Sequence, residues 1–161
     1  MLRLADIEAA SVRALLSRHG LELVLVAEGE PIPGSYWGEC EAGLNGLQVF
    51  ARSDTPVHSL LHEACHLMVM PAERRAQVHT DASDSIAEED AACYLQIMLA
   101  DQLPGVGQAR LMQDMDAWGY SFRLGSTRAW FEQDAVETRA WLMQRGLLPP
   151  HAPEASGADT R

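Results

Sequence analysis

The stretch Val57–Met70, VHSLLHEACHLMVM, is the most informative part of the sequence for the fold. It follows Thr55, whose hydroxyl can cap a helix, and Pro56. Proline is favourable at the first helical position, because the backbone N–H that it lacks would have no partner there. It stops before Pro71, which cannot continue a helix. These flanks predict a single helix over residues 56–70.

The pattern His-Glu-x-x-His places two imidazoles on one side of this helix. At about 100° per residue His62 and His66 point together, and the opposite side carries an apolar arc of Val57, Leu60, Leu61, Ala64 and Met68. Residues four apart are neighbours, so the two rings can converge on one ion at the roughly 2.0–2.1 Å of a zinc–nitrogen bond. Glu63 is rotated away and can act as general base on a water at the ion. The pattern predicts a zinc site with His62 and His66 as ligands.

A third histidine, His58, continues the row on this helix. At a rise of about 1.5 Å per residue it lies about 12 Å from His66 along the axis, too far for both to bind one tetrahedral ion. We expect the His58 side chain to be solvated, with a position supporting the metal ligands as the alternative.

A catalytic zinc ion needs a third protein ligand and keeps its fourth position for water. A metzincin would place Gly three and His six residues after His66, but Val69 and Ala72 stand there, which excludes that class. The candidates lie in the polar connector and at the start of the next helix, which we expect over 86–103; they are His79, Asp81, Asp84, Glu88 and Glu89.

Periodicity favours Glu88 among these candidates. Its helix face carries Ala91, Ala92, Leu95, Met98 and Leu99, whereas the face of Glu89 carries Ala92, Cys93, Gln96 and Ala100. A carboxylate on the more apolar stripe is costly to bury unless it is paired or binds a metal. We therefore predict Glu88 as the third ligand and keep Glu89, His79, Asp81 and Asp84 as alternatives.

Three consecutive segments, LQVFA, HSLLHEACH and EEDAACYLQIML, together resemble a small gluzincin metallopeptidase of the ImmA/IrrE-type group. The last parallels that group's Glu-x-x-Ala-Asn/Asp element, although Ala92 stands where Asn or Asp is usual. The likeness covers residues 47–103. It implies a mostly helical zincin-like domain with a small twisted sheet packed on the HExxH helix, with His62, His66 and Glu88 as zinc ligands and Glu63 as general base.

The rest of the chain predicts an α+β fold around that helix. Apolar spacing indicates further helices over 7–18, 106–118 and 126–145 and strands over 21–26 and 47–51, with a short strand within 35–40. We expect one domain over residues 1–148. The remaining segment, 149–161, is rich in Pro, Ala and Gly, and we expect it to be disordered.

Charge and composition restrict the partners. A formal charge of −11 argues against nucleic acid or an anionic membrane surface as the main partner. The first twenty residues carry charges at helical spacing, not the apolar run of a signal peptide or membrane span, so we expect a cytoplasmic protein. The three cysteines, Cys40, Cys65 and Cys93, lack C-x-x-C spacing, which argues against a disulfide framework and a zinc ribbon. The two that lie in apolar helix patterns are expected as buried thiols.

These observations favour a zinc-dependent metallopeptidase acting on a protein or peptide. Zinc would lower the pKa of its water toward ~7, and Glu63 would move the proton to the leaving amine. Tyr120 is a candidate donor to the oxyanion, although we favour its interpretation as a core aromatic beside Trp118 and Phe122. Two other classes stay open, a zinc-binding regulatory or scaffold protein with little turnover and a metal-free helical interaction domain. The sequence leaves the substrate and the oligomeric state open.

Overall fold

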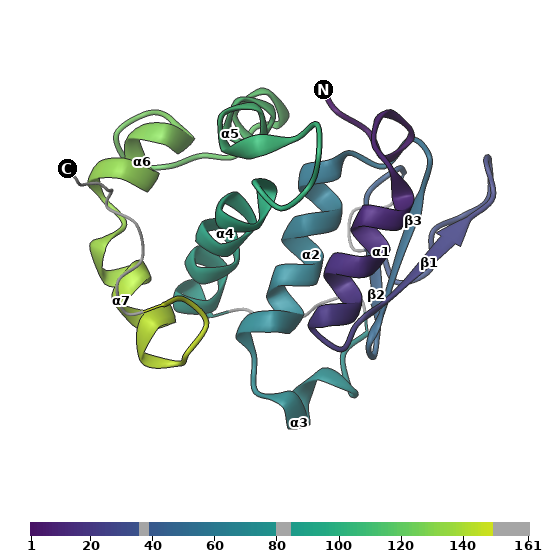
Figure 1. Ribbon diagram of the computed structural model, residues 1–161, viewed down its shortest axis with the longest axis horizontal. Helices are drawn as coiled ribbons and strands as arrows, with labels where there is room; N and C mark the ends of the chain where they lie inside the picture. The colour runs from purple at the N-terminus through teal and green to yellow at the C-terminus, as the bar shows by residue number, and fades with distance from the viewer. Residues whose placement is uncertain (36–38, 80–84, 150–161) are drawn as a thin grey trace.

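The computed structural model describes residues 1–35, 39–79 and 85–149, which form an α+β fold (Figure 1). This confirms the predicted fold class. The helices of the described part are α1 Ala9–Arg18, α2 Val57–Val69, α3 Ala72–Arg75, α4 Ile86–Ala100, α5 Gly107–Trp118, α6 Thr127–Gln133 and α7 Val136–Gln144, preceded by a 3-10 turn at Leu4–Asp6. The strands are β1 Glu22–Val26, β2 Gly43–Asn45 and β3 Gln48–Arg52.

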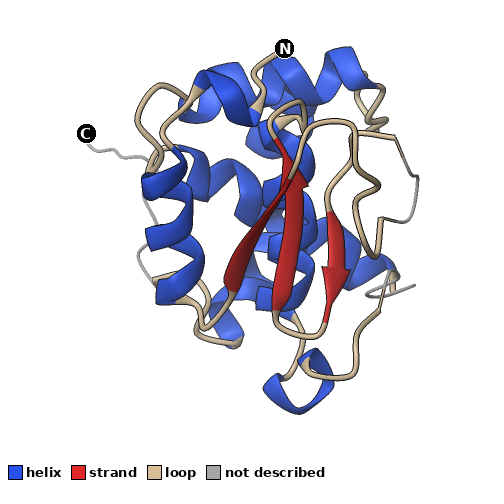
Figure 2. Cartoon of the chain, turned by 90° about the vertical axis from the view of Figure 1, so that its right-hand side faces the viewer, coloured by secondary structure: helices blue, strands red, loops and turns tan. Residues whose placement is uncertain are grey.

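The three strands form one mixed sheet in the order β1-β3-β2, with β1 parallel and β2 antiparallel to β3. A two-residue loop joins β2 to β3, and its first residue, Gly46, has φ of 60°, a conformation that glycine adopts without strain. Val49 and Ala51 of β3 are fully buried, so this strand turns one face to the core. Figure 2 shows the strands in front of the helices.

Helices α2 and α4 form the centre of the molecule and lie side by side in Figure 1. The predicted apolar arc of α2 is buried throughout, since none of Val57, Leu60, Leu61, Ala64 and Met68 is more than 2% exposed. It packs toward β2 and β3. Because α2, α5 and α7 all pack on α4, that helix is buried on nearly every side from Ala91 to Ala100.

The helix predicted over 126–145 is two helices, α6 and α7. The backbone leaves the helical region at Asp134, whose carboxylate accepts a hydrogen bond from Arg123 Nε at 3.0 Å. Ala135, the next residue, is buried. An ion pair to a preceding loop therefore fixes the break, and hydrophobic spacing within the segment does not reveal it.

The start of α2 also differs from its prediction. The Thr55 hydroxyl accepts a hydrogen bond from the Arg52 amide at 2.8 Å, so it closes the turn after β3 and does not cap the helix. The Val57 amide is satisfied instead by the Leu2 carbonyl at 3.0 Å. The N-terminal segment therefore supplies the partner that sequence reasoning assigned to Thr55.

Parts of two expected segments lie outside the described residues. The short strand expected within 35–40 overlaps residues 36–38, and Ser35 alone forms a bridge, to Gly43. The expected tail lies beyond the described chain except for Pro149. Within the described ranges, we find no helix with the length and apolarity needed to cross a bilayer.

Candidate metal centre

Two packed helices bring three ligand-type side chains together. His62 and His66 project from α2, and Glu89 projects from the first turn of α4. The Nε2 atoms of the two histidines are 3.2 Å apart. Glu89 offers one oxygen to each ring, at 3.3 Å from His62 Nε2 and 2.8 Å from His66 Nε2. In the described part of the chain this is the one group of three such side chains close enough to share an ion.

These distances fit a small tetrahedral cation. Two nitrogen ligands at 2.0–2.1 Å from a tetrahedral zinc ion are about 3.3 Å from each other. Two of the separations in the structure, 3.2 and 3.3 Å, lie close to that value, and the third, between His66 and Glu89, is shorter at 2.8 Å. The set of two imidazoles and one carboxylate is also a ligand set that zinc prefers. The residues present therefore fit a zinc ion.

The electrostatics of the site favour a positive charge there. Burial alone lowers the pKa of His62, but Tyr120, Cys93 and Glu89 outweigh it and hold that pKa well above its usual value. Burial disfavours the charged form of Glu89 as well and so raises the pKa of its carboxyl. The hydrogen bonds between Glu89 and the two histidines outweigh this effect and hold that pKa far below its usual value. A cation at this point would meet an ionised carboxylate and acceptor groups already in place.

Gln96 fixes the orientation and tautomer of His62. Its amide nitrogen donates to the His58 carbonyl oxygen at 3.1 Å, which turns Oε1 toward His62 Nδ1 at 2.7 Å. His62 must then donate from Nδ1, so in the neutral form of the ring, which is the form that binds a metal, the lone pair is on Nε2 and faces His66 and Glu89. Gln96 is fully buried, so this hydrogen bond is shielded from water. Its place on the Glu89 face of the helix follows from the sequence, but its contact with His62 does not.

Glu63 lies on α2 beside the ligand pair and is partly buried. Burial raises the pKa of its carboxyl, opposed by the charges of His62 and His66 and reinforced by those of Glu41 and Glu89. A carboxylate that is partly desolvated and adjacent to the site binds a proton more readily than an exposed one. This environment suits a general base.

The structure does not bring Glu88, the predicted third ligand, to the histidines. Its carboxylate pairs with Arg74 of α3, at 3.0 and 3.4 Å. Glu88 is largely buried, as its apolar stripe predicts, with 13% of its side chain exposed. The buried Glu88 carboxylate has a charged partner, as its burial requires, but that partner is the Arg74 guanidinium, and Glu89 is the carboxylate that lies beside the two histidines.

The stripe that faces α2 could have been recognised in the sequence. Glu89, Cys93 and Gln96 recur at helical spacing on one face of α4, and each carries a group that can bind a metal or hydrogen-bond a histidine. Because α4 is buried nearly all round, apolarity does not distinguish its faces, whereas side-chain chemistry does. With Glu89 as ligand, the Glu-x-x-Ala element begins one residue later, and Cys93 stands where the resemblance expects Asn or Asp.

The remaining alternatives for the third ligand do not join the group. His79 is exposed and pairs through its backbone with Asn45 at the edge of the sheet. Asp81 and Asp84 lie outside the described residues.

His58 and Tyr120 lie together next to the histidine pair. The expectation that His58 is solvated was wrong, because the ring is 1% exposed. It packs against Trp118 and Tyr120, and its Nδ1 lies 3.1 Å from the Tyr120 hydroxyl. The Tyr120 ring also packs edge-on against His62, with centroids 5.7 Å apart. Tyr120 therefore combines contacts of a core aromatic with a position beside the candidate metal centre.

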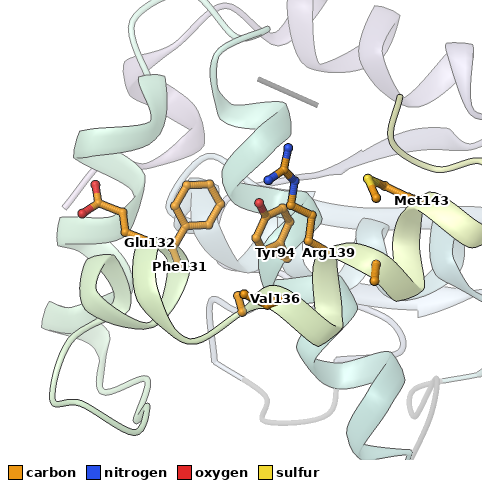
Figure 3. A pocket seen from close by; sticks show the side chains of 8 residues that line it. Tyr94, Phe131, Glu132, Val136, Arg139 and Met143 are labelled. Atoms are coloured by element: carbon orange, nitrogen blue, oxygen red, sulfur yellow. The ribbon is translucent and has the colours of Figure 1, made fainter. Parts of the chain in front are cut away.

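A separate cavity of about 310 Å³ lies on the other side of α4, between α4, α6 and α7 (Figure 3). Tyr94, Phe131 and Arg139 are among the side chains that line it. It shares no residue with the candidate metal centre, and the site described above does not involve it.

Comparison with known protein families, with curated proteins and with solved structures gives no match to this chain.

Proposed function

We propose that this protein is a zinc-dependent metallopeptidase that hydrolyses peptide bonds in a protein or peptide. The observation that carries the proposal is the meeting of His62 Nε2, His66 Nε2 and the Glu89 carboxylate within 3.3 Å of one another, with Glu63 on the same helix turn. Three protein ligands are the number that a catalytic zinc site uses. Glu63 is not among the three ligands, and its carboxylate is the group that distinguishes a catalytic zinc site from a purely structural one.

The side chains have separate roles in this proposal. Zinc held by the three ligands would act as a Lewis acid, lowering the pKa of a coordinated water toward ~7 and polarising the substrate carbonyl. Glu63 would accept the proton of the attacking water and then donate it to the leaving amine. Gln96 would hold the His62 ring in its orientation through the 2.7 Å hydrogen bond. Tyr120 is the candidate donor to the oxyanion.

The alternative function is a zinc-binding regulatory or scaffold protein with little turnover. Both histidines are largely buried, with 13% and 7% of their side chains exposed, whereas half of the Glu89 side chain is accessible. A protein of the alternative class would bind zinc equally well and leave peptide bonds intact. The two functions therefore predict the same zinc content, but only the peptidase predicts turnover of a peptide substrate.

The substitution Glu63→Gln separates these functions. Zinc-loaded protein, purified without a chelator or polyhistidine tag, would be assayed for release of fluorescent peptides from a labelled unfolded protein. We expect Glu63→Gln to keep its zinc and to lose turnover by about 10²–10⁴-fold, the range for removal of a general base. Glu73→Gln, which changes an exposed glutamate on α3, is the matched control and should cleave like the wild type.

Two results would contradict the proposal. Equal turnover in wild type and Glu63→Gln would show that the cleavage comes from elsewhere. A zinc-loaded wild type that cleaves no substrate in a panel of unfolded proteins and mixed-sequence peptides would favour the alternative function.

A further inference from the structure

Cys93 lies one helical turn after Glu89 on α4 and points to the same group of atoms. Its side chain is buried, with the residue 3% exposed. Sγ lies 4.0 Å from Glu89 Oε2. Cys93 therefore lies beside Glu89, one of the three proposed ligands.

The two central helices present matched pairs of ligand-type residues. On α2 the pair is His62 and His66, and on α4 it is Glu89 and Cys93, each four residues apart and so on one face of its helix. Side chains that project from two facing helices in this way surround a point between them. Two such pairs supply four ligands, the number that a closed tetrahedral site contains.

The distance between the thiol and Glu89 is close to that between two bound ligands. For bonds of about 2.3 Å to sulfur and 2.1 Å to oxygen, a tetrahedral zinc ion separates the two ligand atoms by about 3.6 Å. The separation in the structure is 4.0 Å. Binding to the same ion would require the Cys93 sulfur to move toward the group that His62, His66 and Glu89 already form.

The other two cysteines differ from Cys93 in their contacts. Cys65 is a fully buried residue of the hydrophobic core on α2. Cys40 is half-buried, and its Sγ lies 3.9 Å from Arg3 Nη1. The structure shows neither of them in hydrogen-bonding contact with His62, His66 or Glu89 in the described part of the chain.

We propose that Cys93 Sγ is a fourth protein ligand of the metal, so that His62, His66, Glu89 and Cys93 form a closed site in the resting protein. On binding, the thiol gives its proton to solvent and the sulfur forms the bond to the ion. This inference rests on the metal site of the proposed function but not on its hydrolytic activity. In an active peptidase, water and substrate could reach the fourth position only after the Cys93 sulfur leaves it, and Cys93 would therefore restrain turnover.

Cobalt(II) provides the test, because a thiolate bound to cobalt gives a charge-transfer band in the near ultraviolet that nitrogen and oxygen ligands do not give. Reduced full-length protein would be titrated with cobalt(II). We expect the wild type to show this band together with the visible bands of a tetrahedral ion. Cys93→Ala should lose the charge-transfer band and keep visible bands, whereas Cys65→Ala, a buried cysteine on the facing helix, should retain both.

A double variant, Cys40→Ser with Cys65→Ala, leaves Cys93 as the only thiol and tests the assignment without removing Cys93. It should still show the charge-transfer band. Cobalt binding by the wild type without that band would overturn the role of Cys93 and leave the three-ligand site intact. Loss of the band in the double variant, or its persistence in Cys93→Ala, would also overturn it. No cobalt binding at all would overturn both this inference and the metal site of the proposed function.

Discussion

The smallest unit of the site is the chain of hydrogen bonds from the His58 carbonyl through Gln96 to the His62 ring. The two contacts are 3.1 and 2.7 Å long and lie in the buried space between α2 and α4. A neutral imidazole has one donor and one acceptor nitrogen. Because His62 Nδ1 donates to the Gln96 oxygen, Nε2 is the nitrogen left to bind a metal. In the proposed zinc site Gln96 would therefore position His62 without itself contacting the metal.

Removing the Gln96 acceptor should weaken zinc binding. In Gln96→Leu we expect zinc affinity to fall by about 10–100-fold, the usual effect of losing a hydrogen-bond partner of a histidine ligand. A competition titration against a chromophoric chelator would measure it. The matched control is Gln102→Leu, just after α4, whose side chain accepts from Arg18 in an exposed position. Equal affinities in the two variants and the wild type would refute the role of Gln96.

The contrast between Glu88 and Glu89 shows how far residue-level prediction extends. The two histidines and Glu63 follow from spacing along one helix, which fixes the relative position of side chains a turn apart. The third ligand depends on how α4 is rotated against α2, and that rotation is set by packing with α5 and α7 as well. Burial of Glu88 was a correct inference. Its partner, Arg74, comes from a short helix that the sequence analysis did not anticipate.

At the scale of elements, the first turn of α4 carries the carboxylate that completes the site. Ser85 caps this helix, since its hydroxyl accepts a hydrogen bond from the Glu88 amide at 3.3 Å. Glu89 lies only four residues after the cap. The position of its side chain therefore depends on a helix end that would otherwise fray.

Loss of this cap should affect both stability and the metal site. We expect Ser85→Ala to lower the free energy of unfolding by about 1 kcal/mol, typical for a removed N-cap, and to weaken zinc binding as well. Ser126→Ala removes an equivalent cap, the acceptor for the Ala129 amide at the start of α6, away from the ligands. It should cost similar stability, measured by denaturant unfolding, and leave zinc affinity unchanged. An equal loss of zinc affinity in both variants would contradict a specific role for the α4 cap.

The elements themselves were partly predictable. Helices α2, α4 and α5 and strands β1 and β3 lie within a few residues of their expected limits, because each combines a clear period with end signals such as proline or glycine. Strand β2 was not predicted, since its three residues are too short to show a period and lie in a segment rich in glycine. Its pairing with β3 depends on the tight turn at Gly46.

At the scale of the whole molecule, the proposed zinc ion would join the two helices on which the rest of the fold packs. His62 and His66 belong to α2, which contacts β2, β3 and α5, and Glu89 belongs to α4, which contacts α5 and α7. An ion bound only by the folded state stabilises that state in proportion to the logarithm of its concentration. Removal of the metal should therefore weaken the link between α2 and α4 and lower the stability of the folded state.

We expect a chelator to lower the thermal unfolding temperature of the zinc-loaded wild type. At a free zinc concentration of 100 times Kd, the lost stabilisation is about 2.7 kcal/mol. Scanning calorimetry with and without chelator would measure the shift, with Glu89→Gln as the variant that should show a much smaller one. The same shift in wild type and Glu89→Gln would mean that zinc stabilises the fold from another site.

The most direct test of the central claim is the zinc content of four proteins purified without chelator or polyhistidine tag: wild type, His62→Ala, Glu89→Ala and Glu88→Ala. The geometry of the site predicts about one zinc per chain in the wild type and in Glu88→Ala, with loss of zinc in His62→Ala and Glu89→Ala. Because Glu88 pairs with Arg74, its removal should cost stability and not metal. Zinc retained by Glu89→Ala and lost from Glu88→Ala, or a wild type that binds no zinc when it is supplied, would contradict the account.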